Sequence, residues 1–123
     1  MRVVKHLVQW PFVVLAVAFL AGCASTQSRY VPLGATVPPL PDGTEVHVFR
    51  DGLPDRPFDR VSRLAVHLER THFIGSDLED ALPELRRQAR LSGAEAIIEI
   101  QEQRSQVGET KIYHVTAVGI RYR

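Results

Sequence analysis

The chain has very little cysteine, since only Cys23 occurs among its 123 residues. A single cysteine cannot form a disulfide within the chain, and thiolate zinc sites need several cysteines. Tryptophan and methionine also occur once each, as Trp10 and Met1. The folded part must therefore be stabilised by an ordinary hydrophobic core, without covalent cross-links.

Long hydrophobic runs are also scarce, and the main one is N-terminal. It spans Leu7–Ala21, is interrupted only by Gln9 and Pro11, and follows the basic residues Arg2 and Lys5. A permanent membrane-spanning helix needs about 20 apolar residues, so this run is short for one. A basic start, a short apolar stretch and small residues at its end are the parts of a secretory signal. The alternative is an uncleaved anchor helix with an incidental cysteine.

The run ends in Leu20-Ala21-Gly22-Cys23, which resembles the lipobox of bacterial lipoproteins. The resemblance implies that residues 1–22 are a signal peptide, cut between Gly22 and Cys23. It also implies a diacylglyceryl group on the Cys23 sulfur and an acyl group on its new amine, and several chains anchor a protein stably. In this family an aspartate after the cysteine signals retention in the inner membrane. Ala24 follows here, which favours the periplasmic side of the outer membrane.

Neither sign of charge dominates the chain, which has 15 basic and 14 acidic side chains. Cleavage of the signal removes Arg2 and Lys5 but no acid, so 13 of the 15 basic residues would face 14 acidic ones. Nucleic-acid binding needs a clustered positive face, which this balance does not indicate. We therefore expect no nucleic-acid partner.

Residues 23–43 contain the cysteine and a proline-rich stretch without hydrophobic periodicity. Its prolines are Pro32, Pro38, Pro39 and Pro41. Such segments extend by about 3.1 Å per residue, so we expect a tether of up to about 60 Å between lipid and domain. The alternative to a plain spacer is a segment that threads through a partner. The folded domain is then expected at residues 44–123.

Hydrophobic periodicity in residues 44–123 predicts a small α+β domain. Leu78, Leu82 and Leu85 begin an apolar stripe, and Ser76 or Asp80 can serve as the N-cap of a helix that is solid over about 81–92. The order β-β-α-β-β predicts a mixed sheet of about four strands with one main helix on one face, and a crossover between parallel neighbours. Alternation of apolar residues predicts the strands near residues 44–48, 60–69, 94–102 and 111–122.

One helix can cover only one face of such a sheet. The alternation places Ala96 and Ile98 on the helix side and Ile97 on the other side. Ile97, Tyr113 and Val115 are therefore expected together on the uncovered face, as an apolar surface for another chain.

The segment Gly93-Ala94-Glu95-Ala96-Ile97-Ile98 follows a helix that ends near Ala89. Together they resemble the helix-then-strand signature of RcsF-like and YbjQ-like small domains, over about residues 44–122. For RcsF-like proteins the resemblance implies a stress sensor of the outer membrane whose domain carries disulfides, and this chain lacks those cysteines. For YbjQ-like domains it implies metal binding and ring assembly, and no metal motif of that kind occurs here.

Histidines are the only other candidates for chemistry. His67 and His72 are five residues apart at the end of a predicted strand, which is not the helical i, i+4 spacing of many metal sites. They are weak candidates for a metal, and ordinary surface or half-buried histidines are the alternative. No serine–histidine–aspartate order, phosphate loop or closely paired carboxylates occur, so we expect no catalytic residues and no enzyme.

These features predict a non-catalytic lipoprotein of the cell envelope that binds other proteins, as a sensor or an assembly accessory. Its partners are expected to be the membrane, through the lipid, and either another envelope protein or a second copy of the chain. No cofactor is expected besides the covalent lipid on Cys23. The alternative function is the binding of a small ligand or a metal.

Replacing Cys23 by serine tests the lipobox. We expect Cys23→Ser to abolish the incorporation of radiolabelled palmitate and to leave an uncut precursor, because the thiol is the acceptor of the first lipid. Gel mobility and label incorporation in the bacterial envelope measure both effects. A variant that still matures to the normal size and stays in the membrane fraction would show that Cys23 is incidental.

Overall fold

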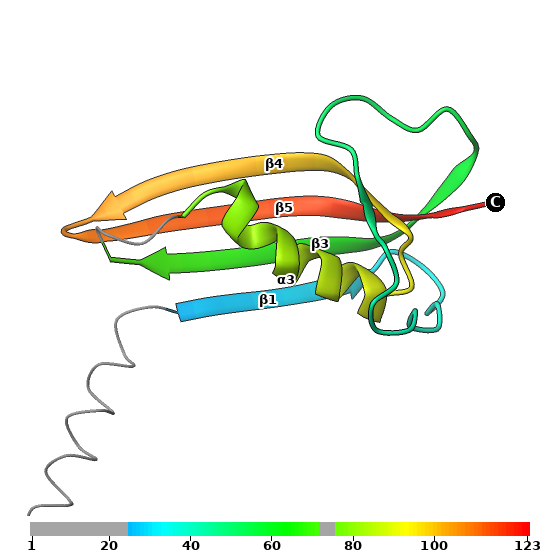
Figure 1. Cartoon of the computed structure of the whole chain (residues 1–123), viewed down its shortest axis with the longest axis horizontal. Coiled ribbons are helices and arrows are strands. Elements are labelled where there is room, and N and C mark those ends of the chain that lie inside the picture. Colours follow the sequence, from blue (N-terminus) through cyan, green and yellow to red (C-terminus); the bar gives the residue numbers. More distant parts are fainter. Residues whose placement is uncertain (1–24, 72–75) are drawn as a thin grey trace, which may run out of the picture.

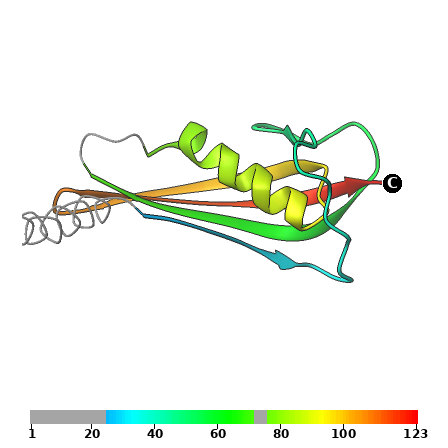
Figure 2. The ribbon, with the colours of Figure 1, turned by 60° about the horizontal axis from the view of Figure 1, so that its bottom comes forward.

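The computed structural model describes residues 25–71 and 76–123 (Figure 1). Within these residues, five strands form a mixed sheet in the order β1-β3-β5-β4-β2, and a helix packs on one face (Figure 2). This confirms the predicted α+β fold. Gly22, Cys23 and His72 lie outside the described residues. The elements in chain order are β1 (Ser25–Pro32), β2 (His47–Val48), β3 (Phe58–Arg70), α3 (Leu78–Leu91), β4 (Ala96–Val107) and β5 (Thr110–Tyr122).

Strand β1 lies in the segment that the sequence predicts to be a tether, and the prediction is wrong there. It pairs antiparallel with β3 over its whole length, from Ser25 opposite Glu69 to Pro32 opposite Ser62. The rest of the segment is also in contact with the domain, because the Leu40 amide donates to the Arg90 carbonyl at 2.8 Å. The folded domain therefore includes Ser25 and does not begin at residue 44.

Polar side chains fix β1 beneath the helix. The Ser28 hydroxyl donates to the Glu84 carboxylate at 2.6 Å, and the Gln88 amide donates to the Ser28 oxygen at 2.9 Å. The Arg87 guanidinium and the Ser28 hydroxyl together hold the pKa of Glu84 below its usual range. Such an edge strand needs few apolar residues, since its backbone is paired by β3 and its side chains are tied by hydrogen bonds. Hydrophobic periodicity could not reveal it.

Strand β5 lies between β3 and β4 and is antiparallel to both. The expected crossover between parallel neighbours is therefore wrong: β3 and β4 are parallel, but β5 separates them. A hairpin joins β4 to β5, with Val107 opposite Thr110 and Gly108 at a φ of +60°. The predicted first strand is reduced to β2, two residues that pair in parallel with β4 at the far edge.

Helix α3 begins after Asp77, whose side chain accepts from the Asp80 amide while the Asp80 side chain accepts from the Asp77 amide. This capping box satisfies two amides that the first turn leaves free, so neither Ser76 nor Asp80 is the N-cap. Pro83 lies inside the helix on its exposed side. Gly93 follows the helix at a φ of +78°, and a Cβ there would lie 2.5 Å from a Val37 methyl group.

Two clusters of buried side chains lie on opposite faces of the sheet. The smaller one, away from α3, contains Ala96, Ile98 and Ile120. The alternation predicts Ile98 on the helix side and Ile97 on the other side, and this is wrong. Ile97 faces α3 and Ile98 faces away from it. The larger cluster lies between α3 and the sheet and consists of Val46, Leu64, Val66, Leu68, Ala81, Leu82, Leu85, Ala89, Ala94, Ile97, Tyr113, Val115 and Ala117.

Alternation puts Ile97 and Ile98 on opposite faces but does not determine which face α3 covers, and a β-bulge after Ile98 then interrupts the pattern. The register of β4 against β5 shifts between Ile98 and Gln101, and Glu99 has a φ of +54°. The extra residue changes which side the following residues face. Ile98 and Ile100 therefore pack in different clusters, although they are two residues apart.

Leucine truncation on the two sides of α3 tests this packing. We expect Leu85→Ala to lower the free energy of unfolding by about 2–5 kcal/mol, since Leu85 is fully buried. The same change at Leu91, which is 38% exposed, should cost about 0.5 kcal/mol or less. Urea unfolding followed by circular dichroism measures both. Equal losses would contradict the assignment of the buried side of α3.

Candidate functional site

The three residues predicted as an interaction surface are not at the surface. Ile97, Tyr113 and Val115 are fully buried in the cluster beneath α3. The register partners of Tyr113 and Val115 on β3 are Leu68 and Val66, and these are also fully buried. The strand β5 is apolar on both sides, so its pattern did not indicate which side the helix would cover.

Tyr113 is also unsuited to acid–base chemistry. Its hydroxyl is buried and forms no hydrogen bond within the described part of the chain. Burial raises the pKa of Tyr113, and the Glu102 carboxylate raises it further. The Arg104 guanidinium lies 5.2 Å from the centre of the ring. The phenol therefore stays protonated and serves as a large apolar group of the core.

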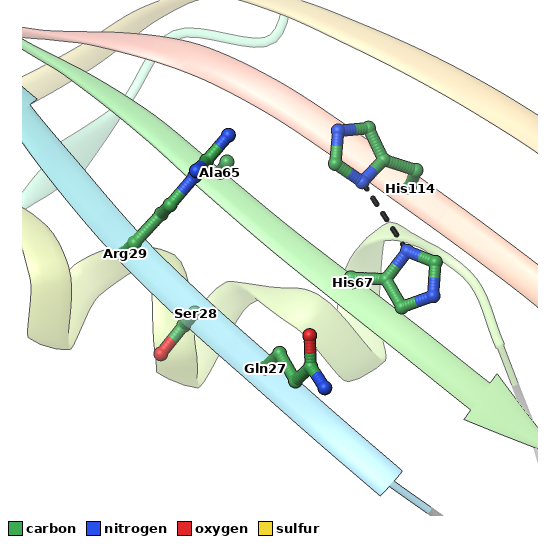
Figure 3. A pocket seen from close by; sticks show the side chains of 6 residues that line it. All are labelled: Gln27, Ser28, Arg29, Ala65, His67 and His114. Atoms are coloured by element: carbon green, nitrogen blue, oxygen red, sulfur yellow. Dashed lines mark hydrogen bonds between the residues drawn. The ribbon is translucent and has the colours of Figure 1, made fainter.

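The sheet face opposite α3, which we call the open face, carries a row of four polar side chains at one level. Gln27 of β1 is the register partner of His67 on β3, His67 that of His114 on β5, and His114 that of Gln103 on β4. Figure 3 shows the two histidines pointing toward each other from neighbouring strands. Shallow hollows lie on both sides of the histidine pair, one toward Gln27 and one toward Gln103.

The structure shows a different neighbour for His67 from the one that the sequence suggests. His72 lies outside the described residues, and the structure places His67 against His114, 47 residues later. Register partners in an antiparallel pair lie on the same face of the sheet, and for His67 and His114 this is the open face. The only sequence signal was that each histidine lies in a long predicted strand, and the register between those strands cannot be read from either one.

The other half of the open face is apolar. Phe49, Phe58, Val118 and Tyr122 are half-buried there and pack against the small cluster around Ile98. The Arg56 guanidinium lies 4.1 Å from the centre of the Tyr122 ring. These aromatic side chains cover the small cluster, so this end of the open face has its own layer of side chains.

Within the described residues, strand β1 is a free edge of the sheet. Its register with β3 is continuous over Ser25–Pro32, without a bulge. Val31 and the following Leu33 are 50% and 43% exposed. The opposite edge, β2, is only His47–Val48. The longer and more regular edge is therefore β1, and it carries exposed apolar side chains at its end.

No family model, curated protein or solved structure matches the chain. The resemblance to RcsF-like and YbjQ-like domains therefore stays a prediction. In residues 25–71 and 76–123 no helix is both long enough and apolar enough to span a membrane. In the same ranges no three or more His, Cys, Asp or Glu side chains gather as a group that could hold a metal.

A pair of adjacent substitutions tests which side of β5 is buried. Val115→Asp places an unpaired carboxylate in the core, and we expect it to cost roughly 4 kcal/mol or more, enough to unfold much of the protein. Thr116→Asp, on the open face, should cost less than about 1 kcal/mol. Thermal unfolding by circular dichroism distinguishes them. A folded Val115→Asp protein would restore Val115 as a surface residue.

Proposed function

We propose that this chain is a lipoprotein anchored on the periplasmic side of the bacterial outer membrane, and that it acts by binding another protein without catalysis. The lipobox at Cys23 supports the anchor. The free edge of β1 supports protein binding and is the observation that carries this part of the proposal. The proposed partner is an extended segment of an envelope protein, which would make this chain a sensor or an assembly accessory.

The anchor and the edge strand are close together in the chain. Ser25, the first residue of β1, is two residues after Cys23, and two residues span at most about 7 Å. A lipidated chain would therefore hold the beginning of β1 next to the bilayer, not at the end of a long tether. At this end Arg70 donates to the Ser25 carbonyl at 2.5 Å and to the Thr26 hydroxyl at 2.6 Å. These bonds fix the strand to the sheet close to the anchor.

An edge strand presents unpaired backbone amides and carbonyls to any extended chain that can align with it. Many proteins recognise peptides by this addition of a strand, in which the backbone supplies affinity and side chains supply specificity. Natural edges are usually protected by lysine, internal proline or a bulge. Strand β1 has no lysine and no bulge, its only proline is its last residue, Pro32, and its one charged side chain is Arg29. Exposed Val31 and Leu33 add apolar contact at that end.

A second copy of the chain is the alternative partner, because an edge strand can also pair with its own equivalent. Binding of a small ligand or a metal is the second candidate function. One specific observation favours it, the direct contact of His67 with His114.

Photo-crosslinking in intact cells tests the role of β1. We expect p-benzoylphenylalanine at Gln27 or Val31 to give a defined crosslinked protein, because both side chains are exposed on the edge strand. The same residue at Leu91, exposed on α3, is the control and should give none. Mass spectrometry of the adduct distinguishes an envelope protein from a second copy. Adducts at Leu91 but not on β1 would contradict the proposal.

A matched pair of charge substitutions gives an independent measurement. Val31→Lys places a charge at the end of the edge strand and should reduce the adduct formed through Gln27 several-fold. Val107→Lys makes the same change at a residue that is 68% exposed at the end of β4, and it should leave the adduct unchanged. An equal decrease in both variants would show that the effect comes from charge alone.

A further inference from the structure

His67 and His114 approach each other through the same ring atom. Their Nδ1 atoms lie 3.4 Å apart, the ring centroids are 5.6 Å apart, and the rings are tilted by 57° (Figure 3). The His67 side chain is 31% exposed, so the pair is accessible from the open face. Two potential ligand atoms therefore point into one small space between β3 and β5.

The distance between the two nitrogens fits a bound metal. A histidine nitrogen lies about 2.0–2.1 Å from Zn²⁺ in a tetrahedral site, so two such ligands are about 3.3–3.4 Å apart. The observed separation of the Nδ1 atoms is 3.4 Å. A metal ion can therefore take the place of the proton between the two rings without any movement of the strands.

A carboxylate is placed to orient one of the two ligands. The Nε2 atom of His67 lies 3.1 Å from the Glu69 Oε1 atom, two residues along the same strand. A carboxylate accepts the Nε2 proton and thereby leaves the Nδ1 lone pair free for a metal, an arrangement that is common around metal-bound histidines. Glu69 thus favours the tautomer of His67 that a metal site requires.

The surroundings leave room for further ligands. Gln27 and Gln103 flank the pair in register, and their amide oxygens or water can complete the coordination. The charged groups on the open face beside the pair are Arg29 from β1 and Glu69 from β3, while Arg104 of β4 lies over the Tyr113 ring on the helix side. The charges of Arg29 and Glu69 are opposite, so the preference among metals follows from the two imidazole ligands.

We propose that His67 and His114 form a two-histidine site for a divalent transition metal, with Cu²⁺ bound more tightly than Zn²⁺. Nitrogen ligands follow this general order of affinity. With two protein ligands the affinity should be lower than that of a structural zinc site, so the metal exchanges with its surroundings. The site is independent of the proposed protein partner, since it needs only β3 and β5 in register.

Metal titration of the full-length chain, purified without a histidine tag, tests the site. We expect one Cu²⁺ or Zn²⁺ per chain by calorimetry near neutral pH, and loss of binding when both rings are protonated. His67→Ala and His114→Ala should each weaken binding more than about tenfold, and Glu69→Gln about tenfold. His47→Ala is the matched control and should bind as the unaltered chain does, because His47 lies on β2. Absence of binding in the unaltered chain overturns the proposal.

The His72→Ala chain tests whether His114 or His72 is the second metal ligand beside His67. Its Cu²⁺ complex should keep the electron paramagnetic resonance couplings to two histidine nitrogens, whether or not the His67 and His114 variants fold. Coupling to one nitrogen or none in His72→Ala overturns the proposal. So does a folded His114→Ala chain that binds metal with unchanged affinity. The crosslinking result for β1 does not depend on either outcome.

Discussion

The pairing of β3 with β5 is the constraint on which the rest of the structure depends. The two strands pair from Phe58 opposite Tyr122 to Arg70 opposite Lys111, and after a shift between Arg60 and Ser62 they keep one register from Ser62 to Arg70. Because side chains alternate along a strand, this one register determines which residues of both strands face α3 and which face away. A slip by one residue would expose the entire buried set, so burial selects the register strongly. The pairs on the helix side are Leu64 with Ala117, Val66 with Val115 and Leu68 with Tyr113.

Small side chains let the end of α3 pack closely against β3 and β5 at one end of the sheet. Ser62 of β3 and Ser92 after α3 share a buried hydrogen bond of 2.8 Å between their hydroxyls. Gly119 of β5 lies beside them, and a Cβ at that position would be 2.3 Å from the Ser62 hydroxyl and 2.7 Å from the Ala94 Cβ. The end of the helix can approach the sheet this closely because these residues are small.

The same register also produces both proposed sites. It brings His67 against His114 on the open face, and it leaves β3 free to accept β1 on its other side. Gln27 belongs to both regions, since it lies on the edge strand and beside the histidine pair. A partner strand added to β1 would therefore be separated by β1 and β3 from a metal bound between β3 and β5. The two sites are neighbours that rest on one common element.

The sequence by itself determined the class of fold, because the apolar stripe of α3 and the apolar, strand-like segments of β3, β4 and β5 are local patterns. It also determined the lipobox prediction, since that signal lies in contiguous residues ending at Cys23. It did not determine β1, whose polar residues are held by backbone pairing and by Ser28, which no hydrophobic pattern records.

Only the tertiary structure decided which face each residue occupies. Strand β5 is apolar on both sides, and the bulge at Glu99 puts Ile98 and Ile100 on different faces of β4, so neither strand's pattern shows which face α3 covers. The contact between His67 and His114 likewise depends on the register of two strands separated by a helix and a third strand. Register is a property of pairs of segments, and a pattern within one segment cannot contain it.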